Sequence, residues 1–138
     1  MKRIICIVLS IVLIFFLSAC ERNYTHGEYE IKIHSTCVEN NKVGNDWVKI
    51  YRCNGNQISS KDKITALLGE EVTIRAQFTE QDKYSDTGSS SVKIVLEDGA
   101  KETFDVRVVE DNGAYDGNVA IWRVNVEVKL LKKKCIRN

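Results

Sequence analysis

The chain has 138 residues, of which 28% are charged, and its formal net charge is +1 at neutral pH. This length suits a single domain with a modest hydrophobic core, and the balanced charge argues against a nucleic-acid-binding protein, which needs concentrated positive charge. The sequence contains no GxSxG, HExxH or phosphate-binding glycine motif. None of these enzyme classes is therefore indicated, and we expect a protein without catalytic activity.

The N-terminal segment has the pattern of a secretory signal peptide. Lys2 and Arg3 precede an apolar run over residues 4–17, which at about 14 residues is shorter than the ~20 needed to span a bilayer. The run ends in Leu-Ser-Ala-Cys at residues 17–20, and this tetrapeptide resembles the lipobox of bacterial lipoproteins. The resemblance implies cleavage before Cys20 and attachment of a fatty-acylated lipid to its sulfur. An uncleaved N-terminal anchor is the alternative.

The lipobox resemblance also implies how the chain is organised. Residues 1–19 would be a signal peptide, residues 20–27 a short polar tether, and residues 28–138 one domain on the extracytoplasmic side of the cell membrane. Two acyl chains on Cys20 would anchor the protein stably without a transmembrane span. The expected partners are this membrane and an envelope protein or wall polymer.

Basic residues cluster near the C-terminus. They are Lys129, Lys132, Lys133, Lys134 and Arg137. We interpret the cluster as a solvated end of the domain, and contact with anionic lipid or an acidic wall polymer is the alternative.

Alternation of apolar and polar residues with period two predicts β-strands along the chain after residue 27. The predicted strands cover residues 28–34, 47–53, 70–78, 92–97, 102–110 and 119–131, and 63–68 is ambiguous. Asp98-Gly99 is the strongest hairpin signal, and Asn54-Gly55 marks another turn. About seven strands without an amphipathic helix predict an all-β antiparallel sandwich, with the first and last strands as candidate sheet edges.

Two short motifs resemble immunoglobulin domains. DNGAY at residues 111–115 resembles the corner before a late strand of that family, and LGEEVTIRAQF at residues 68–78 resembles its second strand. The resemblance implies an immunoglobulin-like sandwich in which a buried Tyr115 hydroxyl bonds to nearby backbone. The cysteines of that family are absent, with Ala76 and Gly117 near their positions, and a different sandwich topology is the alternative.

Three cysteines follow the lipobox, namely Cys37, Cys53 and Cys135. An exported domain tolerates disulfides. Because Cys37 and Cys53 flank a plausible hairpin, they are the first predicted pair. Spacing alone leaves a bridge from Cys135 to either of them open.

The loop predicted over residues 79–91 is the first candidate for ligand contacts, because recognition often involves loops on a rigid scaffold. Its candidate contact residues are Glu80, Asp82, Tyr84 and Asp86. His34 shares a strand face with Glu28 and Glu30, and we interpret this face as a solvated polar surface and not as a metal site.

Two acidic loops offer the oxygen ligands that calcium prefers. One contains Glu80, Asp82 and Asp86, and the other contains Glu110, Asp111 and Asp116. In a sandwich, both loops could lie at the same end. Neither loop has EF-hand spacing, so no metal or other cofactor is expected, and calcium is the alternative.

The sequence therefore predicts a membrane-anchored lipoprotein that presents a small β-sandwich as a non-catalytic binding or accessory module in the cell envelope. Two alternatives stay open. The first is a small lipid-anchored hydrolase that acts on the envelope. The second is a structural subunit of an envelope complex, for which an exposed apolar patch or an open sheet edge is expected.

Overall fold

In the computed structural model, the described residues are 24–82, 84–111 and 116–135. The predicted signal peptide, Cys20 and Tyr115 lie outside these ranges. The only regular elements in the described part of the chain are β-strands. No helix among these residues is long and apolar enough to cross a membrane.

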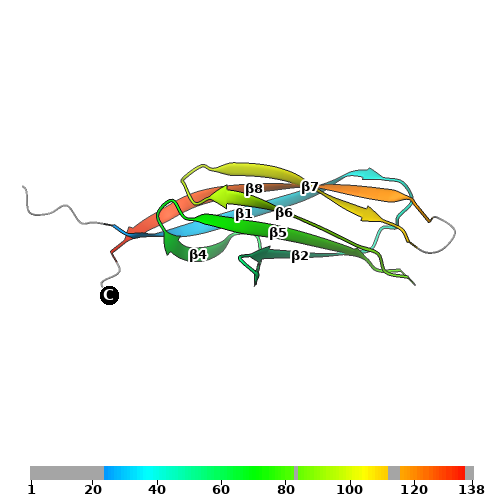
Figure 1. Ribbon diagram of the computed structural model, residues 1–138, viewed down its shortest axis with the longest axis horizontal. Coiled ribbons are helices and arrows are strands. Elements are labelled where there is room, and N and C mark those ends of the chain that lie inside the picture. Colours follow the sequence, from blue (N-terminus) through cyan, green and yellow to red (C-terminus); the bar gives the residue numbers. More distant parts are fainter. Residues whose placement is uncertain (1–23, 83, 112–115, 136–138) are drawn as a thin grey trace, which may run out of the picture.

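Eight strands form two four-stranded sheets that pack into a sandwich (Figure 1). The strands are β1 (His26–Asn40), β2 (Trp47–Cys53), β3 (Asn56–Ile58), β4 (Asp62–Leu67), β5 (Glu71–Glu80), β6 (Thr87–Val95), β7 (Lys101–Val109) and β8 (Val119–Lys134). We call the sheet with the order β4-β1-β8-β7 sheet A and the sheet with the order β3-β2-β5-β6 sheet B. All neighbouring strands are antiparallel, so the predicted all-β sandwich is confirmed.

The core lies between the two sheets. Its residues can be identified from the alternation of apolar and polar residues along each strand. Successive side chains on a strand point to opposite faces, so alternate residues share one face. Most of the apolar residues at alternate strand positions are buried, namely Tyr29, Ile31, Ile33, Val72, Ile74, Ala76, Phe78, Ile94, Leu96, Val106, Val108, Ala120, Trp122, Val124, Val126 and Val128. Val92, Phe104 and Leu130, which the same alternation places inward, are only partly buried. Phe78 of sheet B packs edge to face on Trp122 of sheet A, with 5.3 Å between ring centroids. The apolar phase of each strand thus holds the sheets together.

β1 and β8 pair along almost their whole length. The register runs from His26 opposite Lys134 to Asn40 opposite Ala120. With 15 residues at about 3.3 Å each, β1 gives the sandwich a long axis of roughly 50 Å. Figure 1 shows this elongated shape, with the start of β1 and the end of β8 together at one end. β1 begins at His26, so the last two residues of the expected tether belong to the sandwich.

The Asp98-Gly99 turn does not form the predicted hairpin. The strand before it, β6, belongs to sheet B, whereas the strand after it, β7, belongs to sheet A. The Gly99 N–H donates to the Val128 carbonyl at 2.9 Å. The Leu130 N–H donates to Asp98 Oδ1, also at 2.9 Å. Because these bonds dock the turn on β8, the chain crosses from one sheet to the other here.

The Asn54-Gly55 turn is confirmed. Asn54 and Gly55 have positive φ values, of 47° and 85°, as a type I′ turn requires. The turn joins β2 to the short β3, with Cys53 opposite Asn56. The ambiguous segment at residues 63–68 lies largely in β4, which pairs with the first part of β1.

The predicted sheet edges are wrong. β1 and β8 are the two inner strands of sheet A, and the edge strands of the two sheets are β3, β4, β6 and β7. The strand order also departs from that of the immunoglobulin constant-type domain, in which the first strand lies at a sheet edge.

The predicted disulfide between Cys37 and Cys53 does not form, and both residues are free thiols. Cys37 lies in β1 of sheet A, and Cys53 lies in β2 of sheet B. A hydrogen bond of 2.8 Å from Tyr51 Oη to Ser35 Oγ aligns the two strands. Because β1 and β2 run in opposite directions, the two cysteines lie on opposite sides of this contact. A disulfide needs Cα atoms within about 7 Å, and this offset keeps them apart.

Candidate functional site

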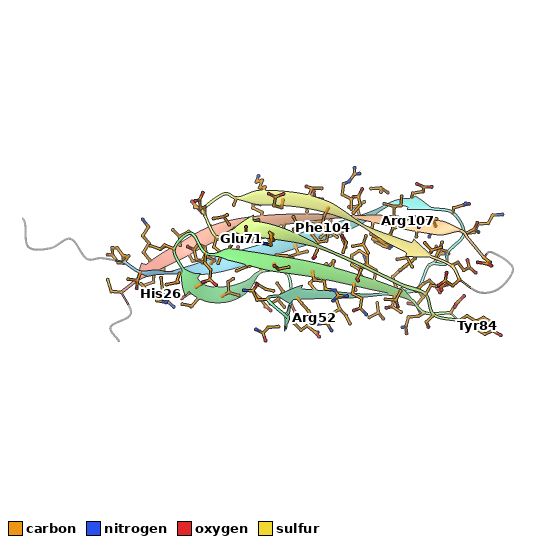
Figure 2. All side chains as sticks on the ribbon, viewed as in Figure 1. His26, Arg52, Glu71, Tyr84, Phe104 and Arg107 are labelled. Atoms are coloured by element: carbon orange, nitrogen blue, oxygen red, sulfur yellow. The ribbon has the colours of Figure 1, made fainter. Side chains whose placement is uncertain are left out.

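Three loops lie at the end of the sandwich remote from His26 (Figures 1 and 2). Their described residues are 41–46 between β1 and β2, 81, 82 and 84–86 between β5 and β6, and 110, 111 and 116–118 between β7 and β8. The Gln81 N–H donates to the Asp46 carbonyl at 2.8 Å. The Asp111 N–H donates to Asp86 Oδ1 at 3.2 Å. The two predicted acidic loops therefore lie together, and we call these three loops with Glu80 the acidic tip.

Three carboxyl groups of the acidic tip are buried. The exposed fractions are 3% for Glu80, 7% for Asp86 and 6% for Glu110. The Asp86 backbone carbonyl also accepts the Glu80 N–H at 2.9 Å. In contrast, the Oε2 atoms of Glu80 and Glu110 have no hydrogen-bond partner within the described part of the structure. A buried charge without a partner is strongly unfavourable. A bound proton or a nearby cation would therefore stabilise each of these two oxygen atoms.

The loop between β1 and β2 covers Glu80. Gly44 has a φ of 111°, and a Cβ atom at this position would overlap the Glu80 carboxyl group. The Gly44 carbonyl accepts hydrogen bonds from Asn40 Nδ2 at 2.7 Å and from Trp47 Nε1 at 3.3 Å. The sequence of this loop predicts only a turn, and its glycine is the one signal that the backbone approaches another group closely.

Burial and neighbouring negative charge raise the pKa values of both buried glutamates. For Glu80, burial is the largest cause of the raised pKa, and the negative charge of Asp82 adds to it. For Glu110, burial is again the largest cause of the raised pKa, followed by the charges of Asp86 and Asp82. Carboxyl groups from separate loops thus increase the proton affinity of the two glutamates.

The predicted contact loop is shorter than expected, and its four candidate residues divide into two pairs. β5 and β6 both extend into the predicted range, so the loop covers only residues 81–86. Glu80 and Asp86 are buried beneath the surface. Asp82 and Tyr84 are exposed, Tyr84 by 52%, and the Asp82 carboxylate accepts the Tyr84 N–H at 2.7 Å. Figure 2 shows Tyr84 at the extreme end of the acidic tip.

Among the residues that the structure describes, no three His, Cys, Asp or Glu side chains form a ready metal-binding group. His34 is exposed in β1, with its Nε2 atom 3.1 Å from Thr36 Oγ1. Glu28, on the same face of β1, lies 2.6 Å from Lys134 Nζ. These contacts place His34 and Glu28 in a polar, hydrogen-bonded sheet face.

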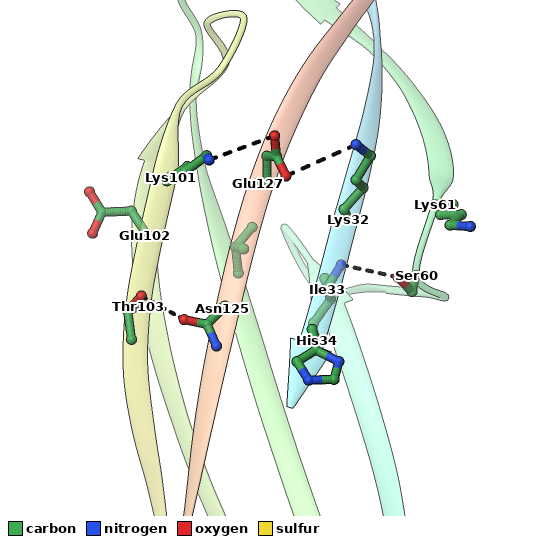
Figure 3. Close-up of a pocket in the computed structure, with 11 residues that line it drawn as sticks. Lys32, Ile33, His34, Ser60, Lys61, Lys101, Glu102, Thr103, Asn125 and Glu127 are labelled. Carbon is green, nitrogen blue, oxygen red and sulfur yellow. Dashed lines mark hydrogen bonds and ion pairs between the residues drawn. The ribbon is translucent and has the colours of Figure 1, made fainter. Parts of the chain in front are cut away.

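A groove of about 450 Å³ lies on the outer face of sheet A (Figure 3). The residues that line it include Lys32, Lys61, Lys101, Thr103, Asn125 and Glu127. The Thr103 hydroxyl donates to Asn125 Oδ1 at 2.9 Å. The sequence does not predict this groove, because outward polar residues of neighbouring strands come together only once the strand order is known. We call it the sheet A groove.

The sheet A groove carries a small excess of positive charge. Three lysines and two glutamates line it, which leaves a net charge of +1 with His34 neutral. Figure 3 shows Lys32 and Lys101 reaching Glu127 from the two neighbouring strands. Each Nζ atom lies 4.0 Å from a Glu127 carboxylate oxygen. Exposed ion pairs of this kind stabilise a fold little, so both lysines are available to an anionic ligand.

Comparison with known proteins finds no matching family model, no similar curated protein and no similar solved structure. Function is therefore inferred from the geometry and charge of the acidic tip and of the sheet A groove.

The raised pKa values of Glu80 and Glu110 give a pH dependence of definite sign. A carboxyl group with a higher pKa in the folded state binds more protons when the chain is folded. Its stabilising contribution is present below the ordinary pKa of 4.5 and is lost as the pH rises through the folded value. We expect Glu80→Gln and Glu110→Gln to raise the midpoint of thermal unfolding by a few degrees at pH 7 in chelator-containing buffer. Circular dichroism between pH 5 and pH 8 should also show a flatter stability curve.

Glu39→Gln is the matched control for these two variants. Glu39 is an exposed carboxylate in β1 near the same end of the sandwich. Its replacement should leave the pH dependence of wild-type stability unchanged. A loss of stability at pH 7 in both Glu80→Gln and Glu110→Gln would show that the ionised glutamates stabilise the tip, which contradicts this assignment.

Proposed function

We propose that this chain is a lipid-anchored bacterial envelope protein that holds an elongated β-sandwich outside the membrane as a non-catalytic binding module. The observation that carries the proposal is the arrangement along the long axis. The start of β1 and the end of β8 lie at one end, and the acidic tip lies at the other (Figure 1). A lipid on Cys20 would therefore direct the acidic tip away from the bilayer and leave the sheet A groove accessible.

The lysines at the end of β8 support the proposal that this end of the sandwich faces a membrane surface. Lys129, Lys132 and Lys133 are exposed, whereas Lys134 is paired with Glu28 at 2.6 Å. Clustered basic residues attract anionic lipid headgroups, by about 1 kcal/mol for each residue near the surface. Contact with anionic lipid thus becomes the preferred interpretation of the basic cluster.

The sheet A groove suits a negatively charged, hydroxyl-rich ligand. Lysine ammonium groups such as those of Lys32 and Lys101 bind phosphate or carboxylate groups, and Thr103 and Asn125 carry donors and acceptors for hydroxyl groups. The volume of about 450 Å³ falls within the range of roughly 300–1,000 Å³ that small-ligand sites occupy. An envelope polymer with repeated phosphate or carboxylate groups has the matching chemistry.

Replacement of the lipid-accepting cysteine tests the anchoring. We expect the wild-type chain to incorporate labelled palmitate in living bacteria and Cys20→Ala to lose the label entirely, as seen by gel autoradiography and mass spectrometry. Cys135→Ala is the control, because Cys135 is an exposed cysteine beyond β8. Label that survives in Cys20→Ala, or its absence from the wild type, would contradict the lipoprotein assignment.

Replacement of the groove lysines tests the ligand class. The double variant Lys32→Gln/Lys101→Gln should bind soluble polyglycerol phosphate at least about tenfold more weakly than the wild type, because two charge-assisted contacts are lost. Isothermal titration calorimetry of the full-length protein in mild detergent measures this, and wild-type affinity should fall as salt is added.

Lys93→Gln is the matched control for the groove, because Lys93 forms a similar exposed ion pair, with Glu71 at 2.8 Å, on sheet B. It should bind the polymer as the wild type does. Equal binding of neutral dextran, or no binding of polyglycerol phosphate, would contradict an anionic ligand. Release of polymer fragments during the titration would favour the hydrolase alternative.

A further inference from the structure

We infer that the acidic tip is a binding site for a divalent cation, with calcium as the best-suited ion. The inference does not depend on the lipid anchor or on the sheet A groove. Its ligands would be carboxylate groups at the end of β5, in the loop before β6 and in the loop after β7.

Two buried oxygens point to the ion. Glu80 is 3% exposed and Glu110 is 6% exposed, and the Oε2 atom of each is unpartnered within the described residues. The two glutamates come from the ends of β5 and β7, which belong to different sheets. Two unsatisfied carboxylate oxygens from opposite sheets are therefore buried at the same end of the core.

Asp86 connects the two glutamates. Its backbone carbonyl accepts the Glu80 N–H at 2.9 Å. Its Oδ1 atom accepts the N–H of Asp111, the residue that follows Glu110, at 3.2 Å. The negative charge of Asp86 also contributes to the raised pKa of each glutamate. Asp86 thus lies between the chain segments that carry Glu80 and Glu110.

The charge around this region is strongly negative. The described charged residues of the tip are Lys42, Asp46, Glu80, Asp82, Asp86, Glu110, Asp111 and Asp116. Seven of these eight side chains are carboxyl groups. Lys83 lies outside the described residues. Lys42 and Lys83 together cannot neutralise seven carboxyl groups, whereas a doubly charged ion would compensate the two buried glutamates.

Calcium fits these ligands better than magnesium does. It accepts six to eight oxygen ligands in flexible geometry, whereas magnesium demands a nearly ideal octahedron. The tip offers carboxylates on loops, and its side chains are not already gathered around one point. The affinity should therefore be modest, with a Kd of about 10⁻⁴–10⁻³ M as in extracellular calcium modules.

Calcium titration of the full-length protein in mild detergent, after removal of divalent ions, tests this site. We expect calcium up to 10 mM at pH 7.5 to raise the midpoint of thermal unfolding by several degrees, with a smaller rise for magnesium at the same ionic strength. Tryptophan fluorescence should change with the same midpoint, because Trp47 bonds to the Gly44 carbonyl above Glu80. Glu80→Gln and Glu110→Gln should each weaken calcium affinity at least about tenfold.

Glu39→Gln is again the matched control and should respond to calcium as the wild type does. A wild-type unfolding midpoint that calcium leaves unchanged, while acidification from pH 7.5 to pH 5 raises it, would overturn the inference, because the glutamates would then take protons in place of a metal ion. An equal loss of response in Glu39→Gln and Glu80→Gln would also overturn it, since the ion would then only screen surface charge.

Discussion

The antiparallel pairing of β1 with β8 is the constraint on which the rest of the molecule depends. It runs from His26 and Lys134 at one end to Asn40 and Ala120 at the other. The pairing places the first and last strands in the middle of sheet A, where β4 and β7 extend it on either side. It also sets the long axis, because no other pair of strands is as long in the described part of the chain. Both candidate sites take their positions from this axis.

Each site arises where strand ends or strand faces meet. The acidic tip forms because β1, β5 and β7 all end at the side remote from the N-terminal segment, so their loops share that end. The sheet A groove forms because Lys32 of β1 and Lys101 of β7 flank Glu127 of β8. The two sites differ in charge, which suits an anionic ligand on the side of the sandwich and a cation at its tip.

Period-two alternation predicted most of the side chains that form the core, although Val43 and Ile58 are also buried and Phe104 is only partly buried. Ile31, Ile74, Val106 and Trp122 are buried because their strands alternate cleanly between apolar and polar residues. The same pattern could not predict which strands are neighbours. Asp98-Gly99 has the composition of a hairpin turn, yet it docks on β8, because a turn signal is local and the sheet that receives the next strand is set by distant residues.

The acidic tip was predicted only in part. A sandwich allows the two acidic loops to lie at the same end, and the Asp111 N–H donates to Asp86 Oδ1 there. It did not predict that Glu80, Asp86 and Glu110 are buried, because charged residues in turn-rich segments are ordinarily solvated. Their burial depends on how loops from different sheets cover one another, and a local sequence pattern does not contain this information.

The distance of the acidic tip from the bilayer in the anchored protein tests the central claim most directly. A fluorescent amino acid would replace the exposed Asp116 in one variant and the exposed Leu131 in another, with energy transfer measured to acceptor dyes on lipid headgroups. We predict strong transfer from position 131 and weak transfer from position 116, because the strands hold the tip roughly 50 Å from the anchored end. Equal transfer from both positions would show that the sandwich lies flat on the membrane and would contradict a tip that points away from it.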